Sequence, residues 1–308
     1  MFSFIKGLTL SQDELDQYYI EQRRRYYDKY GAVPKFIKLH NFFHWLLLPC
    51  IMLLRKINGI KLTIICDERT KTKEPMVYAC THIGGVDIES AFEAIKNPCW
   101  LFLGDPREVY KNIDGFMLGL NGVICLDSKD KDDRRIAKET AIGLLQNGGS
   151  LMIFPEGAWN ISVNQPVMGL FSGTADIAIQ SNAQIVPVAL GCYGKHMYVA
   201  IGKNVDVADA WQDKNELTSY LRDALATLKW RIFEAVGIQS RKAIPENYCQ
   251  TYIDGIINDN KDTSYTEQDV LDTMFRDRSI TTYDDVFNHL KTIPVTKQTA
   301  FLFNKRLR

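Results

Sequence analysis

The sequence predicts an α/β fold, with a mixed, mostly parallel central sheet flanked by helices, and three observations point to it. Short segments rich in β-branched or aromatic residues recur between residues 62 and 202. Gly, Pro, Asn or Asp bounds each of them, which is typical of strands. Helical patterns fill the intervals, so the sheet is expected to be mostly parallel and covered on both faces. The expected strands are 62–66, 76–80, 99–103, 122–127, 150–154, 184–190 and 197–201, and the expected helices between them are 87–96, 106–119, 132–146 and 172–181.

The first predicted element is a helix over residues 11–30. Ser11 and Glu14 have the spacing of a capping box, in which each side chain binds the other residue's backbone N–H. Pro34 follows the pattern and ends it.

The apolar segment that comes next, residues 36–54, is predicted to lie at a membrane interface. Its near-continuous apolar run is shorter than the roughly 20 residues that a helix needs to cross a bilayer, and His44 and Pro49 interrupt it. Residues 1–61 contain ten Lys and Arg against five Asp and Glu, which favours an anionic membrane surface. The alternative is a helix that packs on the body of the protein. No signal peptide is expected, so the protein is expected to be cytoplasmic, peripheral or monotopic on the inner face of the membrane.

Beyond the sheet, residues 209–236 have the pattern of one amphipathic helix, and 266–276 and 284–291 have short helical patterns in a more polar tail. The pattern leaves open whether this tail is a small appendage or a decoration of the domain. We expect a helical membrane-interface segment at 1–61, an α/β domain at 62–237 and a small helical C-terminal appendage at 238–308.

Charge and cysteine content argue against several classes of protein. In 308 residues, 37 Lys and Arg balance 37 Asp and Glu, so no net field favours nucleic acid as a partner. The seven cysteines form no Cys-x-x-Cys pair, and several lie in apolar runs. This indicates reduced core residues and neither a zinc site nor a disulfide framework. We expect no bound metal.

Four short blocks follow one another along the α/β region. They are Thr-His-Ile-Gly-Gly-Val-Asp (81–87), Asn-Gly-Val-Ile-Cys-Leu-Asp (121–127), Phe-Pro-Glu-Gly (154–157) and Ile-Val-Pro-Val-Ala (185–189). In this order they resemble the glycerolipid acyltransferase family, which includes the lysophosphatidic acid acyltransferases. That family has a His-x-x-x-x-Asp block, a Gly-led block, a Phe-Pro-Glu-Gly block and a Val-Pro-Val/Ile block. The resemblance covers about residues 62–205.

The resemblance implies an O-acyltransferase of phospholipid and glycerolipid biosynthesis. Such an enzyme moves a fatty acyl group from acyl-CoA or acyl carrier protein (acyl-ACP) to the hydroxyl of a membrane lysolipid similar to lysophosphatidic acid. The acyl thioester is a co-substrate, and no bound cofactor is expected.

His82 and Asp87 are the predicted catalytic pair. An acyl thioester is already activated, so the catalyst chiefly takes a proton from the attacking hydroxyl and stabilises the resulting oxyanion. His82 is the expected base; the alternative is an ordinary core or surface histidine. Asp87 lies beyond the three or four residues that bring side chains together on a helix. The Gly84–Gly85 loop is therefore expected to fold Asp87 back, so that its carboxylate orients the imidazole.

Substrate-binding roles are predicted in the first three blocks. Gly84 and Gly85 leave backbone N–H groups ahead of a helix for an anion or oxyanion, unless they serve only loop flexibility. By the resemblance, Glu156 and Gly157 contribute to the acceptor site, with a surface turn as the alternative. Gly122, which leads the second block, is expected to bind substrate on the same basis.

Two departures concern arginine, the side chain best suited to bidentate phosphate binding. The family's second block usually ends in Arg where this chain has Ser128, and its third block continues Thr-Arg-Ser where this chain has Ala-Trp-Asn at 158–160. The sequence therefore leaves open whether the acceptor carries phosphate. Trp159 could instead form the floor of a site for a less charged or bulkier headgroup, or fill the core.

Basic residues after the second block are candidate substitutes for the missing arginines. Lys129 and Arg134, with Lys131 and Arg135 beside them, could bind phosphate, unless they form only a solvated start of a helix.

Three other functions stay open. One is an O-acyltransferase for a phosphate-free acceptor such as a lyso-aminolipid. Another is a thioesterase or lipase that uses the same base on water, although the Gly-x-Ser-x-Gly elbow of such enzymes is absent. The last is a membrane-binding module without catalysis.

Overall fold

The computed structural model of the protein describes residues 9–104, 113–163, 165–207, 210–237, 241–260, 265–276 and 296. Contacts group Met1–Met274 into one compact unit and Phe275–Arg308 into another. All helices and strands given below belong to the first unit. The helix predicted over 284–291 lies outside the described residues, and the three-part division of the chain stays a prediction.

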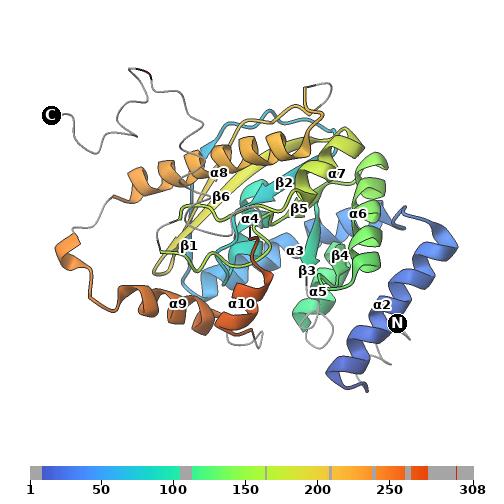
Figure 1. Ribbon diagram of the computed structural model, residues 1–308, viewed down its shortest axis with the longest axis horizontal. Helices are drawn as coiled ribbons and strands as arrows, with labels where there is room; N and C mark the ends of the chain where they lie inside the picture. The colour runs from blue at the N-terminus through green and yellow to red at the C-terminus, as the bar shows by residue number, and fades with distance from the viewer. Residues whose placement is uncertain are drawn as a thin grey trace. The chain divides into compact units, whose positions relative to one another are not determined.

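Seven strands form one sheet in the order β1-β7-β6-β2-β5-β3-β4 (Figure 1). Neighbouring strands are parallel except β6 and β7, which form an antiparallel hairpin with Gly194 at a φ of +59° in its turn. The predicted mixed, mostly parallel sheet is confirmed. The strands are β1 (Lys61–Asp67), β2 (Met76–Cys80), β3 (Trp100–Gly104), β4 (Val123–Leu126), β5 (Leu151–Ile153), β6 (Gln184–Tyr193) and β7 (His196–Ile201).

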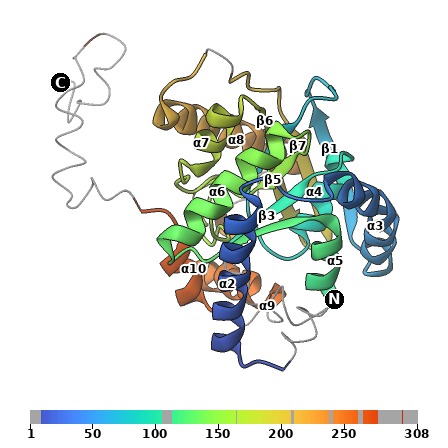
Figure 2. The same cartoon turned by 90° about the vertical axis from the view of Figure 1, so that its right-hand side faces the viewer.

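Helices cover both faces of the sheet (Figures 1 and 2). On one face lie α6, α7 and α8, with α2 packed on α6; on the other lie α4 and α5, with α3 packed on both. Two shorter helices, α9 and α10, follow α8. The helices are α2 (Gln12–Tyr30), α3 (Ile37–Ile57), α4 (Asp87–Ile95), α5 (Ile113–Asn121), α6 (Lys131–Gln146), α7 (Gly173–Ser181), α8 (Lys214–Val236), α9 (Tyr248–Asp259) and α10 (Glu267–Thr273), with a 3-10 turn at Arg241–Ala243.

Strand β2 lies in the middle of the sheet and contributes to the apolar core on each face. Val77 and Ala79 pack with the side chains of α6, α7 and α8, whereas Met76, Tyr78 and Cys80 pack with those of α3 and α4. This alternation follows from the two-residue period of a strand. Because both faces are buried, the whole strand is apolar apart from one phenol, as the sequence pattern suggested.

Most predicted elements are present, and the differences are local. Strand β2 spans the predicted 76–80, while β6 continues past the predicted end at 190 because it pairs with β7 along the hairpin. Helix α8 begins at Lys214, after the cap Asp213. Helix α9 was not predicted, and none of its residues is fully buried.

Helix α3 is longer than the apolar run in the sequence. It continues from Ile37 to Ile57 with Pro49 inside it. Among the residues that the structure describes, it is the one helix long and apolar enough to cross a membrane by length and composition. The prediction that this segment is too short to span a bilayer is therefore wrong as far as length is concerned.

One face of α3 is tied to the body of the protein by polar contacts. The buried His44 ring pairs through Nδ1 with the Asn121 side-chain oxygen at 2.7 Å, and burial lowers the pKa of His44, which keeps the ring neutral. Arg55 donates two hydrogen bonds to the Glu93 carboxylate, at 2.6 and 2.8 Å. The helix thus lies against α4 and α5.

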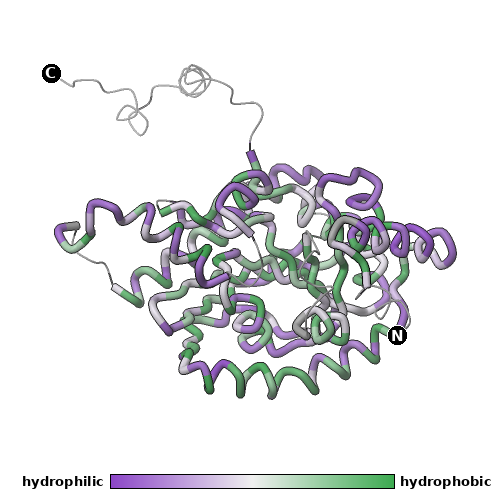
Figure 3. Tube along the Cα trace, turned by 90° about the horizontal axis from the view of Figure 1, so that it is seen from below, coloured by the Kyte–Doolittle hydropathy of each residue, from purple (hydrophilic) through white to green (hydrophobic). Residues whose placement is uncertain are grey.

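The opposite face of α3 is apolar and exposed, and in Figure 3 the helix runs largely green along the lower edge. Contiguous exposed apolar surface of this kind marks a protein or membrane contact. α3 is therefore an amphipathic helix whose exposed face is consistent with membrane association. The exposed apolar residues are Leu39, Phe42, Trp45, Leu46, Leu53, Leu54 and Ile57.

Candidate active site

The candidate site lies where β2 and β5 end. These strands are adjacent and parallel, so the segments that follow them leave the same edge of the sheet. His82 follows β2 and Glu156 follows β5, and the backbone N–H of Asn160 donates to the His82 carbonyl at 2.8 Å. The fourth block forms part of β6, on the other side of β2. Three of the four blocks therefore meet around β2.

The His82 imidazole and the Asp87 carboxylate are in direct contact. Nδ1 of His82 lies 2.8 Å from Oδ2 of Asp87, and the two side chains are 14% and 2% exposed. Gly84 and Gly85 lie between them with φ of +76° and +64°, the left-handed region that glycine adopts without steric cost. These two residues turn the chain so that the carboxylate reaches back to the ring.

Oδ2 of Asp87 is held by three donors. Besides the His82 ring, the backbone N–H groups of Ile83 and Gly84 donate to it at 2.9 and 2.8 Å. Asp87 is also the first residue of α4, where the helix dipole favours negative charge. An ionised carboxylate only accepts hydrogen bonds, so the neutral imidazole carries its proton on Nδ1. The lone pair of the ring is then on Nε2, where it can accept a proton.

Aromatic side chains hold the plane of the His82 ring. Phe154 stacks on it with a centroid distance of 4.2 Å and an interplanar angle of 23°, and Trp159 lies edge-on at 6.3 Å. In the described part of the chain no protein group forms a hydrogen bond with Nε2. The ring is thus fixed in orientation with its basic nitrogen unoccupied.

Glu156, of the third block, is buried and connects that block with the first block by a hydrogen bond to His82. Its carboxylate is fully buried and accepts the backbone N–H of His82 and that of Met168, both at 2.9 Å. Burial raises the pKa of Glu156, and the two N–H donors oppose that shift. The side chain thus fixes the backbone of His82 and points away from solvent.

Lys229 on α8 supplies a buried positive charge to the same region. Its Nζ donates to the Leu190 carbonyl at 2.6 Å. Burial lowers the pKa of Lys229 to about 8, and the charge of Glu156 opposes that shift. Neither the sequence pattern nor the four blocks indicated this lysine, which is distant in the sequence from Glu156 and Leu190.

The two glycine amides that were expected to bind an oxyanion both have partners within the protein. Gly84 N–H donates to Asp87, and Gly85 N–H donates to the side-chain oxygen of Asn260 at 2.8 Å. Asn260 follows α9 and had no local signal in the sequence. In this structure the Gly84 and Gly85 amides therefore hold the turn between His82 and Asp87.

Gly157, of the third block, and Trp159 lie in the loop that follows β5. Gly157 is exposed at this edge of the sheet, with φ of +71°, and a Cβ there would lie 2.5 Å from the Phe171 ring. Trp159 lies between the His82 ring and Tyr265, whose centroid is 5.6 Å away. The position of Trp159 beside His82 is compatible with a substrate contact, and the predicted substrate-binding roles of Gly157 and Trp159 stay predictions.

The predicted second-block residues lie away from His82. Gly122 precedes β4 at the opposite edge of the sheet, and glycine is required there because φ is +99° and a Cβ would lie 2.6 Å from the Trp100 ring. Lys129 and Arg134 are exposed beyond the carboxyl end of β4, and Arg134 donates to the Ser128 carbonyl. Strands β5 and β3 lie between β2 and β4, so β4 is about 14 Å from β2 at the usual strand spacing.

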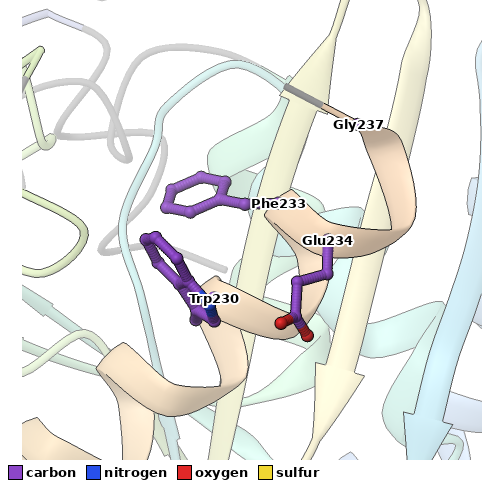
Figure 4. Close-up of a pocket in the computed structure, with 4 residues that line it drawn as sticks. All are labelled: Trp230, Phe233, Glu234 and Gly237. Atoms are coloured by element: carbon purple, nitrogen blue, oxygen red, sulfur yellow. The ribbon is translucent and has the colours of Figure 1, made fainter.

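A separate open hollow of about 270 Å³ lies at the end of α8 (Figure 4). It is lined by Trp230, Phe233, Glu234 and Gly237. None of these residues belongs to the four blocks or contacts His82, so the hollow is not part of the candidate active site.

A protein-family model supports the resemblance seen in the blocks. The acyltransferase family model matches residues 61–191, which contain all four blocks. Among solved structures, the chain is similar to the 1-acyl-sn-glycerophosphate (LPA) acyltransferase PlsC from Thermotoga maritima. The sequence identity is 15% and the TM-score 0.47, over 78% of this chain and 89% of that chain. No curated protein matches the sequence significantly.

Proposed function

Since residues 61–191 match the acyltransferase family, we propose that the protein transfers a fatty acyl group from acyl-CoA or acyl-ACP to the hydroxyl of a lysolipid. The observation that carries this proposal is the His82–Asp87 pair, with Nδ1 bound to the carboxylate and Nε2 unoccupied by protein groups in the described residues. No enzyme nucleophile is needed, because the acceptor supplies the attacking oxygen.

The proposed reaction has two steps. Nε2 of His82 takes the proton of the acceptor hydroxyl while its oxygen bonds to the thioester carbonyl carbon, and the carbonyl electron pair moves onto oxygen. Asp87 stabilises the imidazolium that forms. When the tetrahedral intermediate collapses, the C–S bond breaks and the leaving thiolate takes the proton from His82. The products are the acylated lipid and free CoA or free carrier-protein thiol.

The test is release of thiol from acyl-CoA and from acyl-ACP, with and without lysophosphatidic acid. The wild-type protein is expected to release thiol only with the acceptor present. His82→Ala should lower the rate by about 10²- to 10⁴-fold, the usual effect of losing a general base. His196→Ala, which removes a histidine that pairs with Thr63 at the far edge strand, is the matched control. Thiol release with water alone would instead indicate a thioesterase.

A phosphate-free acceptor, such as a lyso-aminolipid, is the second candidate, and the third block favours it. Where the family has Thr-Arg-Ser, Ala158 is buried in an apolar cluster and Asn160 is engaged with the backbone at Gln165 and Ser162. No guanidinium occupies these positions. The two candidates can be separated by measuring kcat/KM in parallel for phosphate-bearing and phosphate-free lysolipids. The acceptor class with the higher kcat/KM identifies the function.

We also propose that α3 attaches the protein to the membrane surface, on the cytoplasmic side. Its polar face is tied to α4 and α5 by Arg55 and His44, and a bilayer-spanning orientation would break these contacts. The exposed face would then lie in the plane of the interface, near an acceptor that resides in the membrane.

Flotation with anionic vesicles tests this attachment. The combined change Phe42→Ser, Trp45→Ser and Leu46→Ser removes three side chains that are 50–60% exposed. With about 1.5–3 kcal/mol for each fully buried side chain, half-insertion predicts at least a tenfold loss of binding. Trp230→Ser, 54% exposed on α8, is the control. Unchanged flotation of the triple variant would refute the role of α3.

A further inference from the structure

We propose that Asn260 is a positioning residue of the catalytic centre, and that through it helix α9 holds the His82–Asp87 pair in its working geometry. The inference rests on the proposed acyltransferase function for its kinetic consequences. Its structural part concerns the turn at Gly84 and Gly85, and can be measured without any activity.

The Asn260 side chain is clamped at both ends. Its Oδ1 accepts the Gly85 N–H at 2.8 Å, and its Nδ2 donates to the Ile256 carbonyl in the last turn of α9 at 2.7 Å. The residue is only 8% exposed. A buried amide with both ends bonded has little freedom, so it transmits the position of α9 to the turn.

The turn itself is shaped to receive this side chain. A Cβ on Gly84 would lie 2.5 Å from Nδ2 of Asn260, so the absence of a side chain there allows the amide to approach. The N–H of Gly84 binds Asp87, and the next N–H, that of Gly85, binds Asn260. Two consecutive peptide groups, one bound to the Asp87 carboxylate and the next bound to Asn260, therefore connect the carboxylate with α9.

Helix α9 is in turn fixed to the loop that follows β5. The Tyr252 hydroxyl donates to the Asn160 carbonyl at 3.3 Å, and burial raises the pKa of Tyr252 to about 12, so the phenol stays protonated at neutral pH. Apolar side chains of α9, of α10 and of the residue that caps α10 pack with those of the loop. They are Ile253, Ile256, Ile257, Val270, Leu271 and Met274, and the loop residues are Ala158, Trp159, Ile161 and Met168.

The contacts form a closed ring. The loop after β5 is bonded to His82 by the Asn160 N–H, and Tyr252 of α9 is bonded to the same loop. Asn260, at the end of α9, is bonded to the turn at Gly85. Catalytic groups must be held to within a fraction of an ångström, and a misplacement of 1 Å can cost about 100-fold in rate. Asn260 closes this ring at Gly85.

Three variants test the proposal. Asn260→Ala removes the acceptor for Gly85 N–H, Asn260→Asp keeps an acceptor oxygen there, and Asn247→Ala removes an exposed asparagine at the other end of the same helix. We expect Asn260→Ala to lower kcat about 10- to 100-fold with KM for the acceptor unchanged, because a positioning residue acts on the turn and not on the substrates. Asn260→Asp should retain more of the kcat, and Asn247→Ala all of it.

Hydrogen–deuterium exchange of a peptide covering residues 82–87 gives the readout that is independent of activity. Exchange should accelerate in Asn260→Ala and stay near the wild-type rate in Asn260→Asp and Asn247→Ala. If the wild type proves not to transfer acyl groups, this measurement still tests the structural part.

Several outcomes would overturn the proposal. Wild-type kcat and wild-type exchange in Asn260→Ala would show that the contact does no positioning. A higher kcat in that variant would identify Asn260 as an inhibitory contact. A fall in activity matched by an equal fall in folded protein, with Asn260→Asp no better, would reduce its role to general stability.

Discussion

Replacing Asp87 by Asn is expected to remove most acyl transfer and leave the protein folded. The change keeps the shape of the side chain but removes the charge that three donors, among them the His82 ring, now share on Oδ2. A hydrogen bond to a charged group contributes about 1.5–3 kcal/mol and a neutral one about 1 kcal/mol. The attraction between a carboxylate and an imidazolium about 4 Å apart is about 4 kcal/mol at an effective dielectric constant of 20.

These two contributions overlap, so we expect the barrier to rise by about 3–5 kcal/mol, which is about 10²- to 10⁴-fold in kcat. The carboxylate is 2% exposed, and no Lys or Arg of the described residues is bonded to it, so removing its charge also relieves a desolvation cost. We expect the melting temperature to change by less than about 4 °C, the shift for about 1 kcal/mol in a domain of this size.

The assay is thiol release at saturating acceptor, with circular dichroism of the same samples to measure the folded fraction. Asp223→Asn, on the exposed surface of α8, is the matched control and should behave as the wild type. Asp87→Asn with at least a tenth of the wild-type kcat would refute the role of the carboxylate in catalysis. Loss of activity in proportion to loss of folded protein would refute it equally.

Burial and packing lead to three further predictions. In Glu156→Gln, one of the two buried backbone N–H donors faces an amide NH₂ group in place of a carboxylate oxygen. We therefore expect a free energy of unfolding about 1–3 kcal/mol lower in denaturant titration, together with lower activity. Unaltered stability would contradict the structure. Gly122→Ala places a Cβ 2.6 Å from the Trp100 ring at a φ of +99° and should lower the free energy of unfolding by about 1–3 kcal/mol or more. It should leave kcat per folded molecule unchanged, because Gly122 lies at the edge of the sheet opposite to the edge that carries His82. Burial raises the pKa of the Cys99 thiol, so less of it is thiolate at pH 8, and iodoacetamide should label exposed Cys50 but not Cys99 in the native protein. Anionic vesicles should slow the labelling of Cys50, which lies on α3. Equal labelling of both thiols would contradict the burial of Cys99.

The sheet and the contact between His82 and Asp87 could be predicted because their signals are local. Strand β2 is a short apolar segment with polar boundaries, and the distance from His82 to Asp87 is set by the two glycines between them. Pairing of these side chains requires only the turn that Gly84 and Gly85 allow.

Features that depend on distant contacts could not be predicted in this way. Nothing near Asn260 in the sequence shows that its side chain binds Gly85, and Lys229 has no motif that connects it with Glu156. Gly122 belongs to a block of the family pattern, but its reason for being glycine is the Trp100 ring. Whether a residue at a strand end faces the site depends on the direction of the strand, which only the assembled sheet defines.

The role of His82 as the base of an acyl transfer to a lipid hydroxyl can be tested directly on the products. The test is mass spectrometry of lipids formed by equal amounts of folded wild-type and His82→Ala protein from one acyl thioester and a panel of lysolipids. We expect an acylated lipid that forms with the wild type and falls about 100-fold or more with His82→Ala. The same product in equal amount from both proteins would show that His82 is not the base.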